Sequence, residues 1–578
     1  TNTNATGTGS LYEAILNANA NSGVTDTITF NIPGAGPHVI NLTTALPAIT
    51  DTVVIDGTTD PDYAGDPIIQ IDGSALGAGV NGLTFTSTSD GSEVKGLMIT
   101  NFTQHGIQVD SGTDGITISN NWIGTTGTGS VGDGNGDTGI YIQGANTVVG
   151  GTALNDGNVI TNNGNEGINI TGAGATGTII QGNIIGLDPD GATGSGNFDV
   201  GIALLSGAHN TTIGGSTAAA RNIISNNVEG IEINSNNNTV QGNYIGTDVS
   251  GTLDRGNRSD YGVELQNGAT GNLIGGSGAG EGNLIAFNAR DGVYVFNGTG
   301  NAVLGNRIHS NTGLGIDLGV NGVNANDVND VDAGANELQN FPVLSSALTN
   351  GINTIAIEGS LNSTANTDFR IEFFASTVAD TSGYGEAERY LGSVNISTDA
   401  GGNAAFSVNL TDVVAAGEFI TATATIDLGG SNYGSTSEFA QSVPAVLSNF
   451  APTLDNTGIM ALTSIKENEV NSNGDLVSDI IASAGGNRIT DPDVGAVEGM
   501  AVIAVDDTNG TWEYSSDGGS NWTAFGAVTN NSAVVLTGTG NDRIRFVPNA
   551  GFSGVATFTF HAWDTTDALA SGTTGVDA

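Results

Sequence analysis

Acidic side chains make up most of the charged groups in this chain that can do chemistry. Asp and Glu total 59, Lys and Arg total 12, and no cysteine occurs among the 578 residues. Carboxylates and asparagine amides are the oxygen ligands that calcium prefers. The lack of cysteine excludes disulfides and thiolate metal sites. The formal net charge of -47 disfavours nucleic acid and anionic lipid as partners.

The densest acidic segment is "NANDVNDVDAGANE", which places Asp327, Asn329, Asp330 and Asp332 within six residues. Such short polar spacing lets several oxygens converge on one cation. Val331 stands where an EF-hand would have a further ligand, so the segment departs from that pattern. The alternative is a solvated acidic turn. A shorter segment, "LDPDG", suits a type I turn without an ion.

A repeated phrase shows which elements position these groups. Asn-x-Ile begins at Asn121, Asn183 and Asn243, with a degenerate copy at Asn306, so the intervals are 62, 60 and 63 residues. Within each interval a second phrase of the form Gly-apolar-x-apolar occurs twice, about 30 residues apart. Regular periods of this length indicate a solenoid. The phrase begins at Gly139, Gly167, Gly201, Gly230, Gly262, Gly292 and Gly315.

These phrases predict short strands, because apolar β-branched residues alternate and each run ends at Gly or Asn. Three short strands per turn of about 30 residues, joined by Asn and Gly corners, predict a right-handed parallel β-helix. Asn suits the corners because it tolerates left-handed backbone and its amide can bond the amide one coil away. The polar stretch after Asn-x-Ile then becomes a loop that protrudes from every second coil.

The prediction also fixes which side chains form a ladder on the outer face. The middle residues of the phrases should face solvent and stack from coil to coil. Glu232 and Glu264 would lie on adjacent coils, with Asp317 further along, and paired carboxylates can act as acid and base in glycoside hydrolysis. Tyr141 and Tyr294 could stack on sugar rings. The scattered arginines argue against a lyase that acts on uronic acids.

The rest of the chain predicts a cap and two further domains, so the whole chain is expected to be all-β apart from that cap. "GSLYEAILNANA" predicts a helix with a Ser10–Glu13 capping box, which would cover the first coil. We place the β-helix with its N-terminal cap at 1–344. Longer alternating strands predict an antiparallel β-sandwich at 345–445 and a second one at 446–578, which we expect to be cut short at its C-terminal end.

Two resemblances add to this reading. "TGSLYEAILNANANSGVTDTITFNI", "NYIGTDVSG" and "RNIISNN" resemble bacterial surface proteins with right-handed parallel β-helix repeats, over residues 1–345. The last domain, with "ITDPDVGAVEGMAVIAVDDTNGTWEYS", resembles the cadherin-like modules of bacterial adhesins. These resemblances imply a secreted or cell-surface location and calcium binding. For the last domain they imply a site that joins distant strands through Glu467, Asp491, Asp493 and Asp564.

We therefore expect a segment of a large secreted or cell-surface protein with a structural or adhesive role. Such a protein would be stiffened by Ca²⁺ and would bind glycan or another surface, or associate with copies of itself. No catalytic residue is assigned under this reading. The alternative is a polysaccharide hydrolase or lyase, in which Glu232, Glu264 and Asp317 would lie at the active site.

Overall fold

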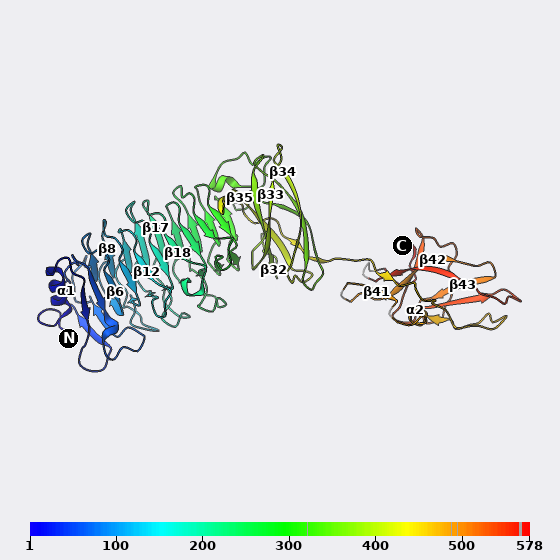
Figure 1. Cartoon of the computed structure of the whole chain (residues 1–578), viewed down its shortest axis with the longest axis horizontal. Coiled ribbons are helices and arrows are strands. Elements are labelled where there is room, and N and C mark those ends of the chain that lie inside the picture. The colour runs from blue at the N-terminus through cyan, green and yellow to red at the C-terminus, as the bar shows by residue number, and fades with distance from the viewer. Residues whose placement is uncertain (321, 487, 494, 566–568) are drawn as a thin grey trace. The chain divides into compact units, whose positions relative to one another are not determined.

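The computed structural model describes residues 1–578 except 321, 487, 494 and 566–568. Contacts divide the chain into two compact units, the first made of 1–347 and 354–445 and the second of 348–353 and 446–578. The first unit contains a parallel β-helix followed by an antiparallel sandwich (Figure 1). Among the described residues, no helix is long and apolar enough to cross a membrane.

Three parallel sheets, here called A, B and C, form the β-helix, and each is given below in spatial order. Sheet A contains β1 (Asp26–Thr29), β3 (Val53–Asp56), β6 (Glu93–Lys95), β9 (Thr117–Ser119), β12 (Val148–Gly150), β15 (Ile179–Gln181), β18 (Thr212–Gly214), β21 (Thr239–Gln241), β24 (Leu273–Gly275) and β27 (Ala302–Leu304). Sheet B contains β2 (His38–Asn41), β4 (Ile69–Asp72), β7 (Leu97–Thr100), β10 (Trp122–Ile123), β13 (Val159–Ile160), β16 (Ile184–Ile185), β19 (Ile223–Ile224), β22 (Tyr244–Ile245), β25 (Leu284–Ala286) and β28 (Arg307–His309). Sheet C contains β5 (Leu83–Phe85), β8 (Ile107–Val109), β11 (Ile140–Ile142), β14 (Ile168–Thr171), β17 (Val200–Leu205), β20 (Glu229–Ile233), β23 (Val263–Leu265), β26 (Val293–Val295) and β29 (Ile316–Leu318).

From the second coil onward each coil contributes one strand to each sheet, so the period of about 30 residues is one coil, as the sequence predicts. The apolar pair of every phrase points inward. Ile140 and Ile142, for example, are fully buried and pair in register with Ile168 and Ile170 on the next coil. Full burial of such a side chain contributes about 1.5–3 kcal/mol. The inner core is therefore a set of aligned isoleucine, valine and leucine columns.

Buried asparagines form ladders at the corners between the sheets. The Nδ2 group of Asn183 donates to Oδ1 of Asn222, and Asn222 donates in the same way to Asn243. The ladder from Asn121 continues in this manner to Asn306, and a second one runs from Asn135 to Asn311. The predicted coil-to-coil amide bonding is confirmed. It satisfies polar groups that water cannot reach.

The N-terminal cap is helix α1 (Leu11–Ala20), which buries Leu11, Ile15 and Ala18 against the first coils. The Ser10 side chain accepts a hydrogen bond from the Glu13 amide. The Glu13 carboxylate accepts one from the amide of Gly9, one residue before the position that the capping-box pattern predicts. The cap is thus present, with its reciprocal bond shifted by one residue.

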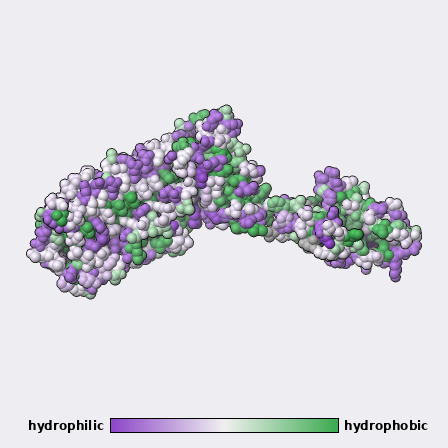
Figure 2. All heavy atoms as spheres, viewed as in Figure 1, coloured by the Kyte–Doolittle hydropathy of each residue, from purple (hydrophilic) through white to green (hydrophobic). Residues whose placement is uncertain are grey.

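Polar loops protrude after the Asn-x-Ile phrases and contact one another from one coil pair to the next. The amide of Gly129 donates to Asp188, and the amide of Val249 donates to the carbonyl of Gly191. Asp190 accepts from the amides of Ala192 and Thr193, so "LDPDG" forms a hydrogen-bonded turn. On the face of the β-helix seen in Figure 2, hydrophilic and near-neutral residues are mixed, and apolar atoms lie in small groups.

The first sandwich contains two sheets. One has β33 (Arg389–Ser397), β32 (Asp368–Ser376), β35 (Phe419–Gly429) and β36 (Asn432–Thr436), with β37 (Val443–Pro444) on β35. The other has β34 (Asn403–Leu410), β31 (Ile355–Asn362) and β30 (Val343–Thr349). Short 3-10 helices occur at η1 (Gly57–Thr59), η2 (Ala218–Ala220) and η3 (Ala335–Leu338).

The sandwich covers the last coil of the β-helix. Phe374 and Phe439 belong to the β-helix core cluster. Buried Glu438 accepts from the amides of Leu318 and Asn324, and buried Glu372 accepts from the amide of Gly305. These carboxylates bond amides at the end of the solenoid that have no further coil to pair with. The β-helix and the sandwich therefore form one compact unit.

The second unit is also built from antiparallel sheets. One sheet contains β40 (Asp475–Leu476), β46 (Arg543–Pro548), β43 (Gly510–Ser515) and β44 (Thr523–Ala524). Another contains β47 (Phe558–Trp563), β42 (Gly499–Val505), β45 (Ala533–Thr537) and β48 (Thr574–Val576). Strands β39 (Thr453–Leu454) and β41 (Ile489–Thr490) form a short antiparallel pair. Strand β38 (Val446–Leu447) pairs with the end of β30. Helix α2 (Val477–Ala482) packs into the core of this unit.

Candidate functional site

The loop that leaves the β-helix brings Asp327, Asp330 and Asp332 together, with one carboxylate oxygen from each within 4.8 Å of the other two. Asn340 and Ser363 hold this group in place. The Asp330 carboxylate accepts from the Asn340 amide at 3.2 Å and from the Ser363 hydroxyl at 2.6 Å. The aspartates of the segment predicted from sequence are thus neighbours in space.

Asn329, the fourth predicted ligand of this loop, has a left-handed backbone with a φ of 65°. Its amide donates to the side chain of Asn362. Asn329 is not in the group of three, and its conformation makes it a turn residue that lets the aspartates converge.

Burial and the mutual repulsion of like charges act on the three aspartates of the first group. Burial, together with the charges of Asp332 and Asp327, raises the pKa of Asp330 to about 6. The hydrogen bonds from Ser363 and Asn340 oppose this rise. Three close carboxylates are destabilised by their like charges, so a bound divalent cation would relieve the repulsion.

A second group in the second unit contains Asp491, Asp493 and Asp564, again with one oxygen from each within 4.8 Å of the others. Oδ2 of Asp491 is buried and has no hydrogen-bond partner. Asp491 and Asp564 line a cavity of about 280 Å³. Residues distant in sequence thus converge here. Glu467 is not in this group and lines a different cavity.

The ladder on the outer face of sheet C lies in the predicted register. Tyr141 pairs with Asn169, Glu232 with Glu264, and Tyr294 with Asp317. Nε2 of Gln266 donates to both Glu232, at 2.6 Å, and Glu264, at 3.1 Å. The two carboxylates therefore lie within hydrogen-bond distance of one nitrogen.

Several ladder positions are more buried than the alternating pattern predicts. Tyr294 is only 6% exposed because its ring stacks on Tyr261 at 4.4 Å. The ring of Tyr141 stacks on His105 at 4.5 Å and is nearly parallel to it. One face of each predicted sugar-binding ring is therefore already covered. Asp317 is 8% exposed, and burial with the charges of neighbouring acids raises its pKa to about 7.

Glu229, which the sequence analysis did not single out, completes the acidic cluster on sheet C. It immediately precedes the glycine of its phrase and is 7% exposed. Burial, then the charges of Glu264 and Glu232, raises its pKa to about 10. Burial and the charge of Glu232 also raise the pKa of Glu264 to about 7, and a side-chain hydrogen bond with Glu229 opposes this. A carboxyl group that keeps its proton at neutral pH thus lies beside Glu232 and Glu264.

A signal for Glu229 was present in the sequence. The residue before the phrase glycine is also acidic at Glu166 and Asp291. Glu166 bonds the Thr138 hydroxyl and the Asn169 amide on the same face. An acidic residue at this recurring position would have indicated a second column beside the ladder.

No protein-family model matches this chain, and no curated protein matches it. Among solved structures, the A-module of mannuronan C-5 epimerase from Azotobacter vinelandii is similar, with 14% identity and a TM-score of 0.22. The match covers 55% of this chain and 95% of that module.

Proposed function

We propose that this chain is a segment of a secreted or cell-surface bacterial protein whose role is structural or adhesive and whose domains are stabilised by Ca²⁺. The observation that carries the proposal is the pair of aspartate groups. One lies in the exit loop of the β-helix. The other brings the loop between β41 and β42 next to the end of β47. Oxygen-only groups of this charge suit calcium. The partner would be a glycan, another surface or a second copy of the chain.

The proposal is tested by melting the full chain after chelation, with and without calcium. Ligands that bind only the native state raise the melting temperature, and the shift grows with the logarithm of the ligand concentration once this exceeds the Kd. Because the two units are separate compact bodies, we expect two transitions, each shifted upward by calcium. Asp332→Asn should abolish the shift of the first unit alone, and Asp493→Asn that of the second.

Asp66→Asn is the matched control, because Asp66 is exposed and belongs to neither group. It should leave both shifts unchanged. A wild-type chain whose transitions ignore millimolar calcium would refute the metal part of the proposal. Equal shifts in all four proteins would place the calcium elsewhere.

A second candidate function is glycoside hydrolysis, and the cluster of Glu229, Glu232 and Glu264 favours it. Such a reaction needs a protonated acid and a carboxylate on the two sides of the scissile bond. The charges that act on Glu229 all come from acids, which favours a neutral or cationic sugar chain over a uronic acid chain. Release of reducing ends from such a polymer, lost in Glu264→Gln and retained in Glu358→Gln on the exposed sandwich surface, would establish it.

A further inference from the structure

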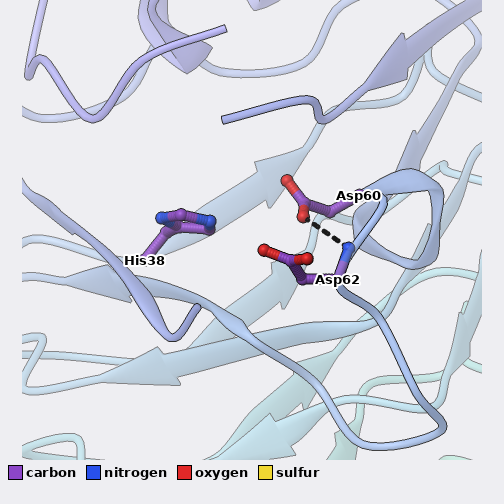
Figure 3. A group of neighbouring side chains, drawn as sticks. All are labelled: His38, Asp60 and Asp62. Atoms are coloured by element: carbon purple, nitrogen blue, oxygen red, sulfur yellow. Dashed lines mark hydrogen bonds between the residues drawn. The ribbon is translucent and has the colours of Figure 1, made fainter. Parts of the chain in front are cut away.

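A third group of possible metal ligands lies in the first coils and differs in chemistry from the aspartate groups. A ring nitrogen of His38 and one carboxylate oxygen each of Asp60 and Asp62 lie within 4.8 Å of one another. Figure 3 shows the imidazole, from β2, facing the two carboxylates, which come from the loop after η1. Residues more than 20 positions apart therefore converge at one point.

The histidine supplies a second, independent observation that points to a ligand. His38 is 7% exposed, and its Nε2 atom is buried without a hydrogen-bond partner. A buried polar atom that is left unpaired destabilises the native state. Native structures therefore leave few such atoms without protein, water or metal partners.

The aspartates are held so that they can take part in ligation. Asp60 is 3% exposed, and its two oxygens accept from the amides of Ile32, at 3.0 Å, and Asp62, at 3.2 Å. Each oxygen has a further lone pair for a metal. Asp62 is exposed, so its side chain is free to move by the small distance that coordination requires.

The donor set selects the kind of ion. Calcium and magnesium take oxygen ligands, whereas imidazole with carboxylates suits zinc and other first-row transition metals. Zinc bonds of 2.0–2.2 Å in a tetrahedral site place ligand atoms about 3.4 Å apart, which is compatible with a group whose ligand atoms all lie within 4.8 Å of one another. Two carboxylates balance a divalent charge, and solvent at Asp62 can supply a fourth ligand.

We propose that His38, Asp60 and Asp62 bind a divalent first-row transition metal ion, with Zn²⁺ as the best match. The ion would join strand β2 to the loop after η1 and so fasten the first coils to one another. This site is separate from the two aspartate groups in residues and in ion preference, so either proposal can fail without the other.

The test is titration of the chelated full chain with Zn²⁺, followed by calorimetry, and with Co²⁺, followed by the visible absorption of low-symmetry cobalt. We expect one binding event that involves these residues and a cobalt spectrum typical of a mixed nitrogen–oxygen site. His38→Gln and Asp62→Asn should each weaken zinc binding at least tenfold. Asp62 is exposed, so its variant should fold even if the histidine variant does not.

Asp66→Asn, in the same loop and with the same change of charge, should bind zinc like the wild type. The calcium-induced shifts in melting temperature should persist in Asp62→Asn. The proposal is overturned if the wild type does not bind zinc, if Asp62→Asn and Asp66→Asn bind it equally, or if calcium displaces zinc at comparable concentration.

Discussion

At the scale of single residues, Glu229 couples protonation to folding. Its pKa rises from the ordinary 4.5 to about 10 in the native state, chiefly through burial. The native protein therefore holds a proton that the unfolded chain releases above pH 4.5. The contribution of this group to stability therefore falls as the pH rises from about 4.5 towards 10.

Glu229→Gln removes this proton linkage while keeping a side chain of the same shape that can donate a hydrogen bond. We expect the first unit of the variant to be more stable than the wild type at pH 8 by more than about 1.4 kcal/mol, the equivalent of one pKa unit. Denaturant unfolding at pH 5, 6.5 and 8 measures this difference. The gap should widen with pH, and Glu358→Gln should show none; parallel curves for the wild type and Glu229→Gln would contradict the assignment.

The sequence predicted part of the acidic cluster for a clear reason. Alternation places Glu232 and Glu264 on the outer face, and the 30-residue period places them on adjacent coils. The alternation of apolar and polar residues does not predict where the side chain of Glu229 points, because the direction of a side chain just before the glycine depends on the backbone of the corner. It also could not predict that Tyr261 covers the ring of Tyr294, since the two belong to different coils.

At the scale of elements, the asparagine ladders hold the corners. Asn222 is fully buried, donates to the carbonyl of Ile180 at 2.8 Å and to Asn243 at 2.9 Å, and accepts from Asn183. Replacing it by alanine removes both donor bonds and leaves several partners unsatisfied. Each such group costs about 1–3 kcal/mol.

We expect Asn222→Ala to lower the free energy of unfolding by at least about 2 kcal/mol. The exposed Asn236 makes a single bond to the amide of Thr270, and its alanine variant should lose about 0.5 kcal/mol or less. Urea unfolding of both variants measures the two losses in the free energy of unfolding. Equal losses would mean that the ladder adds nothing beyond an ordinary surface contact.

The ladders also show which parts of the fold the repeat period of the sequence predicts. Recurring Asn and Gly marked the corners, and the prediction of three strands per coil is confirmed. The exact position of the first coils was harder to predict, because "DTITFNI" and its neighbours lack the Gly-led phrase. The His38 group lies in this irregular part, where aspartates after η1 and a histidine in β2 have no shared spacing.

At the scale of the whole first unit, the sandwich serves as the C-terminal cover of the β-helix. Glu438→Ala would leave the amides of Leu318 and Asn324 without an acceptor. Hydrogen bonds to a charged group contribute about 1.5–3 kcal/mol, so we expect a loss in that range at least. Amide hydrogen exchange should speed up in both β29 and β32, because the two parts share one core.

Glu358→Ala, on the exposed side of the same sandwich, is the control and should change neither region. Faster exchange confined to the sandwich strands would show that the β-helix does not depend on its cover. The sequence separated the two parts at residue 344 by a change of rhythm. It held no sign that Phe374 and Phe439 complete the core of the coils, since that contact joins residues far apart in the chain.

The pairing of coils has a consequence for how such a protein can change its length. About 62 residues bring the chain back to the same sheet, corner and protruding loop, so removing or duplicating one such segment leaves every column of side chains aligned. The caps at both ends would be untouched. Longer and shorter versions of the β-helix would therefore keep the same coil structure. Recombination within the repeated region is a natural route by which the length of this molecule could change.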